Sequence, residues 1–191
     1  MSFTIAMVQQ KGGTGKTTIA DQLAFTLQEM GYVVEVADLD DQQGILFHKV
    51  HEKPETDPDF LIVDTGGSFN TKFNDVSIDD IIANADLVII PVLLEPDSLK
   101  PTTLTARRCE SNNKDYRILF NQVQPNQVLH QILIEQFKNA FPGKVFDTTI
   151  SKRAAISQAR MISQSVTSIS KRSRVTGEFI ALVDEIKKEV V

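Results

Sequence analysis

The chain has 191 residues, of which 41% are hydrophobic and 24% charged, and its formal net charge is −5. This size and balance predict one soluble globular domain, residues 1–191, with a substantial core. The sequence has no apolar run near the roughly 18 residues of a membrane span, no signal-peptide pattern and only one cysteine, Cys109, so we expect a cytoplasmic protein that has no membrane span and no internal disulfide.

Apolar, β-prone runs alternate with helical patterns along the chain. Strands are predicted at 3–9, 32–38, 59–64, 86–91 and 116–120, with a weaker candidate at 145–149. Helices are predicted at 16–30, 42–50, 77–84, 98–112, 126–140, 153–164 and 173–190, and the polar stretch 163–174 is expected to be a loose loop. This alternation predicts a doubly wound α/β fold, with a mostly parallel sheet and helices on both faces. Ligands bind such folds at the carboxyl ends of the strands.

A phosphate-binding loop follows the first strand, where residues 9–18 read Q-Q-K-G-G-T-G-K-T-T. Gly15, Lys16 and Thr17 fill the last three places of the P-loop pattern, while Gln10 stands where the first glycine is usual, so the loop is a deviant form. A strand before it and a helix after it are the flanks that aim a helix N-terminus at an anion. We expect the nucleotide to contact Lys11, Gly12, Gly13, Thr14, Gly15, Lys16, Thr17 and Thr18.

Acidic residues end the second and third predicted strands. Asp38 and Asp40 close the run V-V-E-V-A-D-L-D, and Asp64 precedes a glycine pair in L-I-V-D-T-G-G. A fixed carboxylate beside a P-loop is suited to hold Mg²⁺ through water, so Thr17, Asp38 and Asp64 are the candidate metal residues, with Asp64 the best placed. For Asp38 and Asp40 the alternative is a helix N-cap, although Asp40 is favoured as functional because it lies at the predicted ligand edge.

Together these motifs resemble the deviant Walker A ATPases of the ParA/MinD group, most closely a small ParA plasmid partition protein. The resemblance rests on K-G-G-T-G-K-T-T, D-L-D-D-Q, D-T-G-G and A-D-L-V-I-I-P-V, and extends to I-S-K-R-A-A-I-S-Q-A at 150–159. It implies that Lys16 neutralises the β- and γ-phosphates of ATP and that Thr17 ligates Mg²⁺. It also implies that Lys11 reaches the partner's ATP across a dimer, that Asp40 positions the attacking water and that Asn121 touches adenine.

The sequence departs from the family pattern at two points. Asp41 stands in D-L-D-D-Q where the family usually has proline, which should leave that segment less rigid. Only 23 residues separate Asp40 from Asp64, so a helix of larger members is expected to be reduced.

Several functions share this nucleotide site. Iron–sulfur members of the family need clustered cysteines, which Cys109 alone excludes. A membrane-positioning member needs a basic amphipathic terminal helix. The polar side of 173–190 instead has Glu178, Asp184, Glu185 and Glu189, which anionic lipid would repel, so we expect that helix to pack on the domain and no membrane to be a partner.

Basic residues are concentrated near the C-terminus. Between Thr148 and Gly177 the chain has six basic and no acidic residues, namely Lys152, Arg153, Arg160, Lys171, Arg172 and Arg174. Such a run can be a solvated face, but its contrast with the acidic remainder favours contacts with DNA phosphates, which position a protein without reading sequence. These cations are expected on a surface separate from the P-loop.

The sequence therefore predicts a Mg²⁺-dependent ATPase that partitions DNA. With ATP bound it should form a sandwich dimer and bind DNA non-specifically, and slow hydrolysis, stimulated by a ParB-like centromere-binding or adaptor protein, should release it. Association with the nucleoid is then expected. The alternatives are a ParA-like switch that recruits partners in conjugation or positioning without DNA, and a metabolic ATP-dependent ligase of the same fold.

Overall fold

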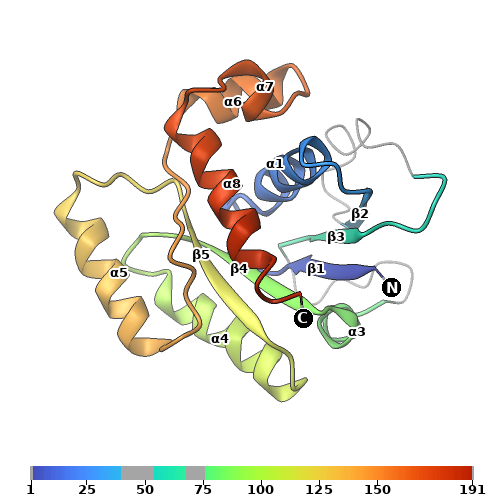
Figure 1. Ribbon diagram of the computed structural model, residues 1–191. Helices are drawn as coiled ribbons and strands as arrows, with labels where there is room; N and C mark the ends of the chain where they lie inside the picture. Colours follow the sequence, from blue (N-terminus) through green and yellow to red (C-terminus); the bar gives the residue numbers. More distant parts are fainter. Residues whose placement is uncertain (1, 40–53, 68–75, 191) are drawn as a thin grey trace.

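The computed structural model describes residues 2–39, 54–67 and 76–190, and its centre is a five-stranded sheet (Figure 1). The strands are β1 (Phe3–Met7), β2 (Val34–Leu39), β3 (Phe60–Thr65), β4 (Leu87–Leu93) and β5 (Tyr116–Asn121). They lie in the order β2-β3-β1-β4-β5, and all four pairings are parallel. The predicted doubly wound α/β fold is confirmed.

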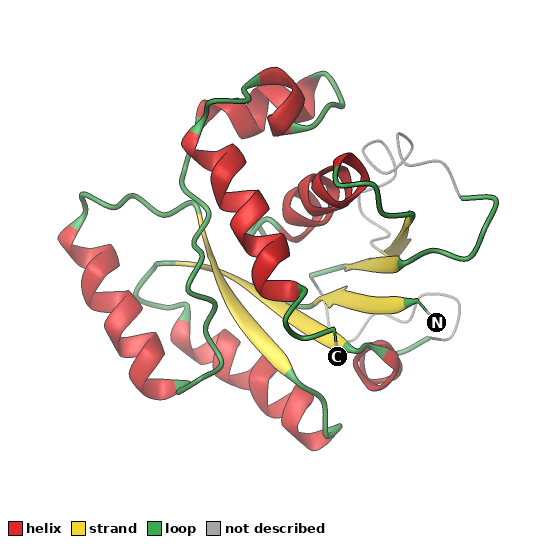
Figure 2. Cartoon of the chain, viewed as in Figure 1, coloured by secondary structure: helices red, strands yellow, loops and turns green. Residues whose placement is uncertain are grey.

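Helices cover both faces of the sheet (Figure 2). They are α1 (Lys16–Glu29), α3 (Ile78–Asn84), α4 (Leu99–Ser111), α5 (Val128–Ala140), α6 (Ala154–Met161), α7 (Val166–Ile169) and α8 (Arg174–Ile186). Helix α1 and α8 lie on one side of the sheet, whereas α3, α4 and α5 lie on the other (Figure 1).

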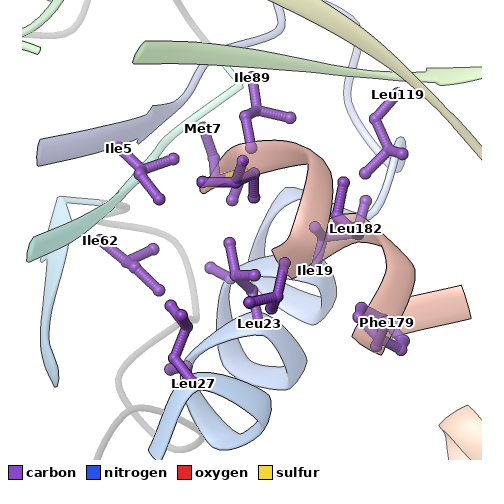
Figure 3. Packing of buried hydrophobic residues seen from close by; sticks show 14 of the residues in the cluster. Ile5, Met7, Ile19, Leu23, Leu27, Ile62, Ile89, Leu119, Phe179 and Leu182 are labelled. Atoms are coloured by element: carbon purple, nitrogen blue, oxygen red, sulfur yellow. The ribbon is translucent and has the colours of Figure 1, made fainter. Parts of the chain in front are cut away.

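The strand side chains alternate between two cores. Ile5 and Met7 of β1 face the core shared with α1 and α8, where Leu23 and Phe179 are buried (Figure 3). Ala6, between them, belongs to the opposite core, which includes Ile82, Cys109 and Phe137 from α3, α4 and α5. Because both faces are buried, the strands read as continuous apolar runs. Each fully buried large side chain stabilises the fold by about 1.5–3 kcal/mol.

The central position of β1 places the loop that follows it in the middle of the ligand edge. β1 pairs with β3 on one side and with β4 on the other, so that Met7 lies beside both Asp64 and Ile89. The motif at residues 9–18 therefore lies between the loops that leave β3 and β4.

Three predicted segments differ from the structure. The weak strand candidate 145–149 is not a strand, because in the described part of the chain this region forms isolated bridges, Ile118 to Val145 and Val123 to Ser151, instead of a continuous ladder with β5 and its extension. The expected loose loop 163–174 contains α7, and Val166 is fully buried against the α1–α8 core. The final helix ends at Ile186 instead of 190. The helix predicted at 42–50 lies outside the described residues.

Candidate functional site

Two glycines in the left-handed backbone conformation shape the loop between β1 and α1. Gly13 has a φ of 74° and Gly15 a φ of 93°, values that residues with a Cβ rarely adopt. Gly15 is the N-cap of α1 and, having no side chain, forms no capping hydrogen bond with the first N–H groups of this helix. A Cβ on Gly12 or Gly13 would meet no atom of the described residues within 4 Å, so these residues leave the outer side of the loop open. An anion can therefore reach the helix N-terminus.

Polar groups are buried inside this loop. Thr14 is 1% exposed, and its Oγ1 has no hydrogen-bond partner in the described part of the chain. Lys16 is 7% exposed, and its Nζ donates a long hydrogen bond of 3.4 Å to the carbonyl of Gln9. A buried hydroxyl without a partner costs about 1–3 kcal/mol, so its presence in the loop points to a ligand that accepts a hydrogen bond there. These donors fit a nucleotide phosphate.

The candidate metal residues lie at the same edge. Asp64 is fully buried at the end of β3, beside Asp38 of β2 in register and beside Met7 of β1. Thr65 Oγ1 donates to the Met7 carbonyl at 2.7 Å, which fixes the end of β3 against β1. Thr17 lies in the first turn of α1. The arrangement suits Mg²⁺ held through water and phosphate oxygens. In the described ranges no group of three His, Cys, Asp or Glu side chains would hold an ion alone.

Lys11 is engaged by acidic residues of its own chain. Its Nζ lies 2.6 Å from Glu95 Oε2 and 2.8 Å from Asp97 Oδ1, both in the loop between β4 and α4. The hydrogen bond to Asp97, followed by that to Glu95, raises the pKa of Lys11, and Lys11 lowers the pKa of Asp97. The cross-dimer role expected for Lys11 therefore requires these contacts to exchange.

Gln9 links the loop to α4. Its fully buried amide donates to the Pro91 carbonyl at 3.4 Å and to Thr102 Oγ1 at 3.3 Å, and it accepts from Thr105 Oγ1 at 3.3 Å. The same Oε1 accepts from the Lys11 N–H at 3.4 Å. The Gln9 side chain thus connects α4 directly to the loop that carries Lys11.

Asn121 lies against the P-loop at the end of β5. Its Nδ2 donates to the Thr14 carbonyl at 2.8 Å, and its Oδ1 accepts from the Gln122 N–H at 2.8 Å. Beside it is a pocket of about 360 Å³ lined by Gly15, Thr18, Asn121, Gln122, Lys152, Arg153, Ala154, Ile156, Ser157 and Arg160. The pocket connects the P-loop with α6 and is the candidate place for the base end of a nucleotide.

Three predicted DNA-binding residues lie in this pocket. Lys152, Arg153 and Arg160, called the pocket cations below, share it with Gly15 of the P-loop. The expectation that they lie on a surface separate from the P-loop is wrong. The reason is that the segment before α6 pairs with the extension of β5, where the Lys152 N–H donates to the Val123 carbonyl at 3.0 Å. This non-local pairing brings residues 150–153 to the ligand edge.

The other three predicted DNA-binding residues lie further along the chain. Lys171, Arg172 and Arg174, called the outer cations below, are exposed between α7 and the first turn of α8. Arg174 Nε donates to Glu178 Oε1 at 2.9 Å, with 59% of its side chain exposed. α7, which precedes them, is docked on α1, since Glu29 accepts hydrogen bonds from Ser165 and Thr167 and Gln22 accepts from the Val166 N–H at 2.7 Å.

Helix α8 packs on the domain, as expected. Phe179, Leu182 and Val183 are fully buried in the core with α1. Two of its acidic residues also hold protein groups, because Glu185 accepts from the Asp147 and Thr148 N–H groups at 2.9 and 2.7 Å, and Glu178 accepts from Ser151. None of the helices described is long and apolar enough to cross a bilayer.

Sequence reasoning missed several residues at this edge. Glu95 and Asp97 follow β4, whose loop was expected at the ligand edge, so their acidity was the signal that could have identified them. Glu178 carried no local signal, because its partner Ser151 is 27 residues away. Asp40, the predicted catalytic carboxylate, lies outside the described residues, and its role stays a prediction.

Comparisons with known proteins agree with this geometry. Residues 5–166 match the family described as CobQ/CobB/MinD/ParA nucleotide binding domain. The whole chain is 27% identical over 220 aligned residues to the maintenance of carboxysome distribution protein A of Halothiobacillus neapolitanus, with 97% of that protein covered.

Two solved structures share the fold over almost their full length. A variant of McdA from Cyanothece in complex with ATP superposes with a TM-score of 0.79 at 14% identity, covering 99% of this chain and 96% of that one. A plasmid partition protein from Borrelia burgdorferi superposes with a TM-score of 0.73 at 18% identity, covering 98% and 99%. At these identities the likeness shows the fold alone.

Proposed function

The chain belongs to the CobQ/CobB/MinD/ParA family of nucleotide-binding domains, and we propose that it is a Mg²⁺-dependent ATPase that partitions DNA in the manner of ParA proteins. The observation that carries the proposal is the loop at residues 9–18, in which Lys16 is buried beneath an open helix N-terminus and Lys11 lies at its rim. In this proposal two lysines supply charge to one triphosphate. One comes from its own chain and the other from a partner copy.

Residues of the loop and of the strand ends have separate roles in nucleotide binding. Lys16 and the first N–H groups of α1 bind the β- and γ-phosphates, and Thr14 Oγ1 gains a hydrogen-bond acceptor. Thr17 and Asp64 hold Mg²⁺ directly or through water, with Asp38 beside them. Bound Mg²⁺ supplies charge that offsets the phosphates during transfer to water. Asp40 orients that water, and Asn121 contacts adenine.

The two lysines act at different stages. In the ATP-bound dimer Lys11 leaves Glu95 and Asp97 and reaches the partner's ATP, where it offsets charge that develops in the transition state. Hydrolysis removes that anion, and Lys11 returns to the acidic residues of its own chain. ATP therefore controls whether the protein is a dimer.

DNA binding is assigned to the outer cations. They are exposed and do not line the pocket, so their charge remains available when nucleotide is bound. Dimerisation doubles this cationic surface, and two linked patches bind one duplex far more tightly than one patch alone. A ParB-like centromere-binding or adaptor protein then stimulates ATP hydrolysis, and the protein is released from DNA. The protein is therefore on the nucleoid only in its ATP state. A plasmid or another low-copy body is the cargo.

A duplex-binding titration with and without ATP tests the proposal. Wild-type protein with ATP and Mg²⁺ should bind duplexes of unrelated sequence with similar affinity, and affinity should fall steeply with salt. Protein with ADP should bind poorly. Absence of duplex binding by the ATP form at low salt would refute the DNA assignment and leave the nucleotide switch.

One observation favours that second candidate, a nucleotide switch that recruits protein partners without DNA. The pocket cations lie beside the P-loop, so three of the six basic residues that indicated DNA have another use in nucleotide binding. A pull-down of a partner by the ATP form, together with no duplex binding, supports the switch.

A further inference from the structure

The wall of the nucleotide pocket that carries Lys152 and Arg153 is held from behind by a residue of α8. Glu178 Oε2 accepts the Ser151 N–H at 2.7 Å, and Glu178 Oε1 accepts the Ser151 hydroxyl at 2.5 Å. Ser151 is 1% exposed, and the Glu178 side chain is 12% exposed. One carboxylate therefore fixes both polar groups of the residue immediately before the pocket cations.

The opposite side of this segment is fixed by β5. The Val123 N–H donates to the Ile150 carbonyl at 2.9 Å, and the Lys152 N–H donates to the Val123 carbonyl at 3.0 Å. Ser151 stands between these two hydrogen bonds, so its own N–H points away from β5 and toward α8. Without Glu178 that N–H would be a buried donor lacking its partner, and the segment would lose one of its two supports.

We infer that Glu178 is a positioning residue for nucleotide binding, which acts through Ser151 to hold Lys152 and Arg153 against the base end of ATP. The inference rests on the proposed function in taking ATP as the ligand of the pocket. Glu178 itself does not line the pocket and so acts only through the segment. Arg174 contributes little to holding the carboxylate, because 59% of its side chain is exposed and exposed ion pairs are weak.

Helix α8 also supplies a matched control. Glu185, seven residues after Glu178, holds the same connecting segment by accepting the Asp147 and Thr148 N–H groups at 2.9 and 2.7 Å. Neither of these residues lines the pocket. Glu185→Ala therefore removes the same kind of support from the same helix without touching the pocket wall.

Nucleotide affinity measured by calorimetry tests the inference with two probes, Mg·ATP and Mg·tripolyphosphate. Tripolyphosphate occupies the P-loop but has no base end. Glu178→Ala should weaken ATP binding about tenfold, a loss in the range of a hydrogen bond to a charged group, and leave tripolyphosphate affinity unchanged. Glu185→Ala should match wild type for both probes.

Two further variants distinguish a loss of positioning from a loss of folding. Glu178→Gln should retain most ATP affinity, because its amide oxygen accepts the Ser151 N–H and its amide nitrogen donates to the Ser151 hydroxyl. Ser151→Ala removes only the hydroxyl bond and should show a smaller loss restricted to ATP. Thermal melts of all variants show whether each is folded at the temperature of measurement.

The inference is overturned if Glu178→Ala and Glu185→Ala bind ATP equally well. It is also overturned if tripolyphosphate affinity falls in parallel with ATP affinity in Glu178→Ala and Ser151→Ala, which is the mark of general destabilisation. If the wild-type protein binds neither probe, the proposed function fails and this inference with it. Wild-type binding together with equal variants overturns the inference alone.

Discussion

The ammonium group of Lys11 lies 2.6 Å from the carboxylate of Glu95, although 84 positions separate the two residues in sequence. Asp97 accepts from the same ammonium group at 2.8 Å. The Glu95 side chain is 49% exposed and the Asp97 side chain 77% exposed, so water screens both contacts. These two contacts of Lys11, with Glu95 and with Asp97, are called the clamp below. The clamp is strong enough to hold Lys11 in place and weak enough for a bound triphosphate to replace it.

Neutralising the clamp should favour the dimer. Glu95→Gln with Asp97→Asn frees Lys11 at no cost to the P-loop, so the ATP-dependent dimer should tighten about threefold, as for loss of weak exposed ion pairs. Lys11→Ala should instead lose the dimer. Light scattering during gel filtration with ATP measures both. A weaker dimer in the double variant would mean that Glu95 or Asp97 contacts the partner.

The clamp should be insensitive to pH near neutrality. Lys11 lowers the pKa of Asp97, so the contribution of this carboxylate is complete above its ordinary pKa and is lost only as pH falls through the lowered one. Asp97 raises the pKa of Lys11, so that contribution is lost only as pH rises through the raised one. The effect of the double variant on dimerisation should be constant between about pH 6 and 9. A strong change in that range would contradict the assignment.

Alanine substitutions of Lys16 and Asp40 should impair different steps of the ATPase cycle. Lys16→Ala removes the buried charge that offsets the phosphates, and should abolish ATP binding or hydrolysis. Asp40→Ala should keep nucleotide binding and the dimer but lose turnover. Phosphate release and gel filtration separate the two. Undiminished ATPase activity in Lys16→Ala would refute the nucleotide site.

Substitution of the pocket cations and substitution of the outer cations should affect different ligands in binding assays. Alanine at Lys152, Arg153 and Arg160 should weaken ATP binding, because these residues line the pocket with Gly15. Alanine at Lys171, Arg172 and Arg174 should leave ATP binding unchanged and weaken every duplex similarly. The slope of log affinity against log salt should then fall by about 0.9 for each DNA phosphate that is no longer neutralised. Loss of ATP binding in the second variant would contradict this division.

Gly15→Ala should damage both stability and nucleotide binding. Its φ of 93° is strained for any residue with a Cβ, and that Cβ would lie 2.3 Å from Asn121 Nδ2. Gly31 is the matched control, because its φ is 92° but a Cβ there would meet none of the described atoms within 4 Å. Gly31→Ala should cost about 1–2 kcal/mol in urea unfolding and keep ATP binding, whereas Gly15→Ala should cost more and lose it. Equal costs would show that Asn121 moves aside freely.

Cys109 should be unreactive in the folded protein. It is fully buried among apolar residues of the second core, and this burial raises the pKa of its thiol to about 12. Iodoacetamide at pH 8 should label it only after urea unfolding, because the thiolate is the reactive form. Rapid labelling of the native protein would show that α4 opens locally.

The sequence by itself determined the sheet class and the phosphate loop, because both depend on local signals. Alternating strand and helix patterns predict a parallel sheet, and the spacing of Gly15, Lys16 and Thr17 after a strand predicts a loop that binds an anion. The sequence also predicts a buried strand at Ile5, Ala6 and Met7, since both faces of a covered sheet are apolar.

Only the tertiary structure decided which distant residues surround that loop. The clamp on Lys11, the pocket cations beside Gly15 and the tie from Glu178 to Ser151 all join residues far apart in sequence. The local sequence does not show whether a run of basic residues or an acidic helix face lies in solvent or contacts another segment of the chain. That choice depends on which elements the sheet order and the α1–α8 packing bring together, and periodicity does not contain this information.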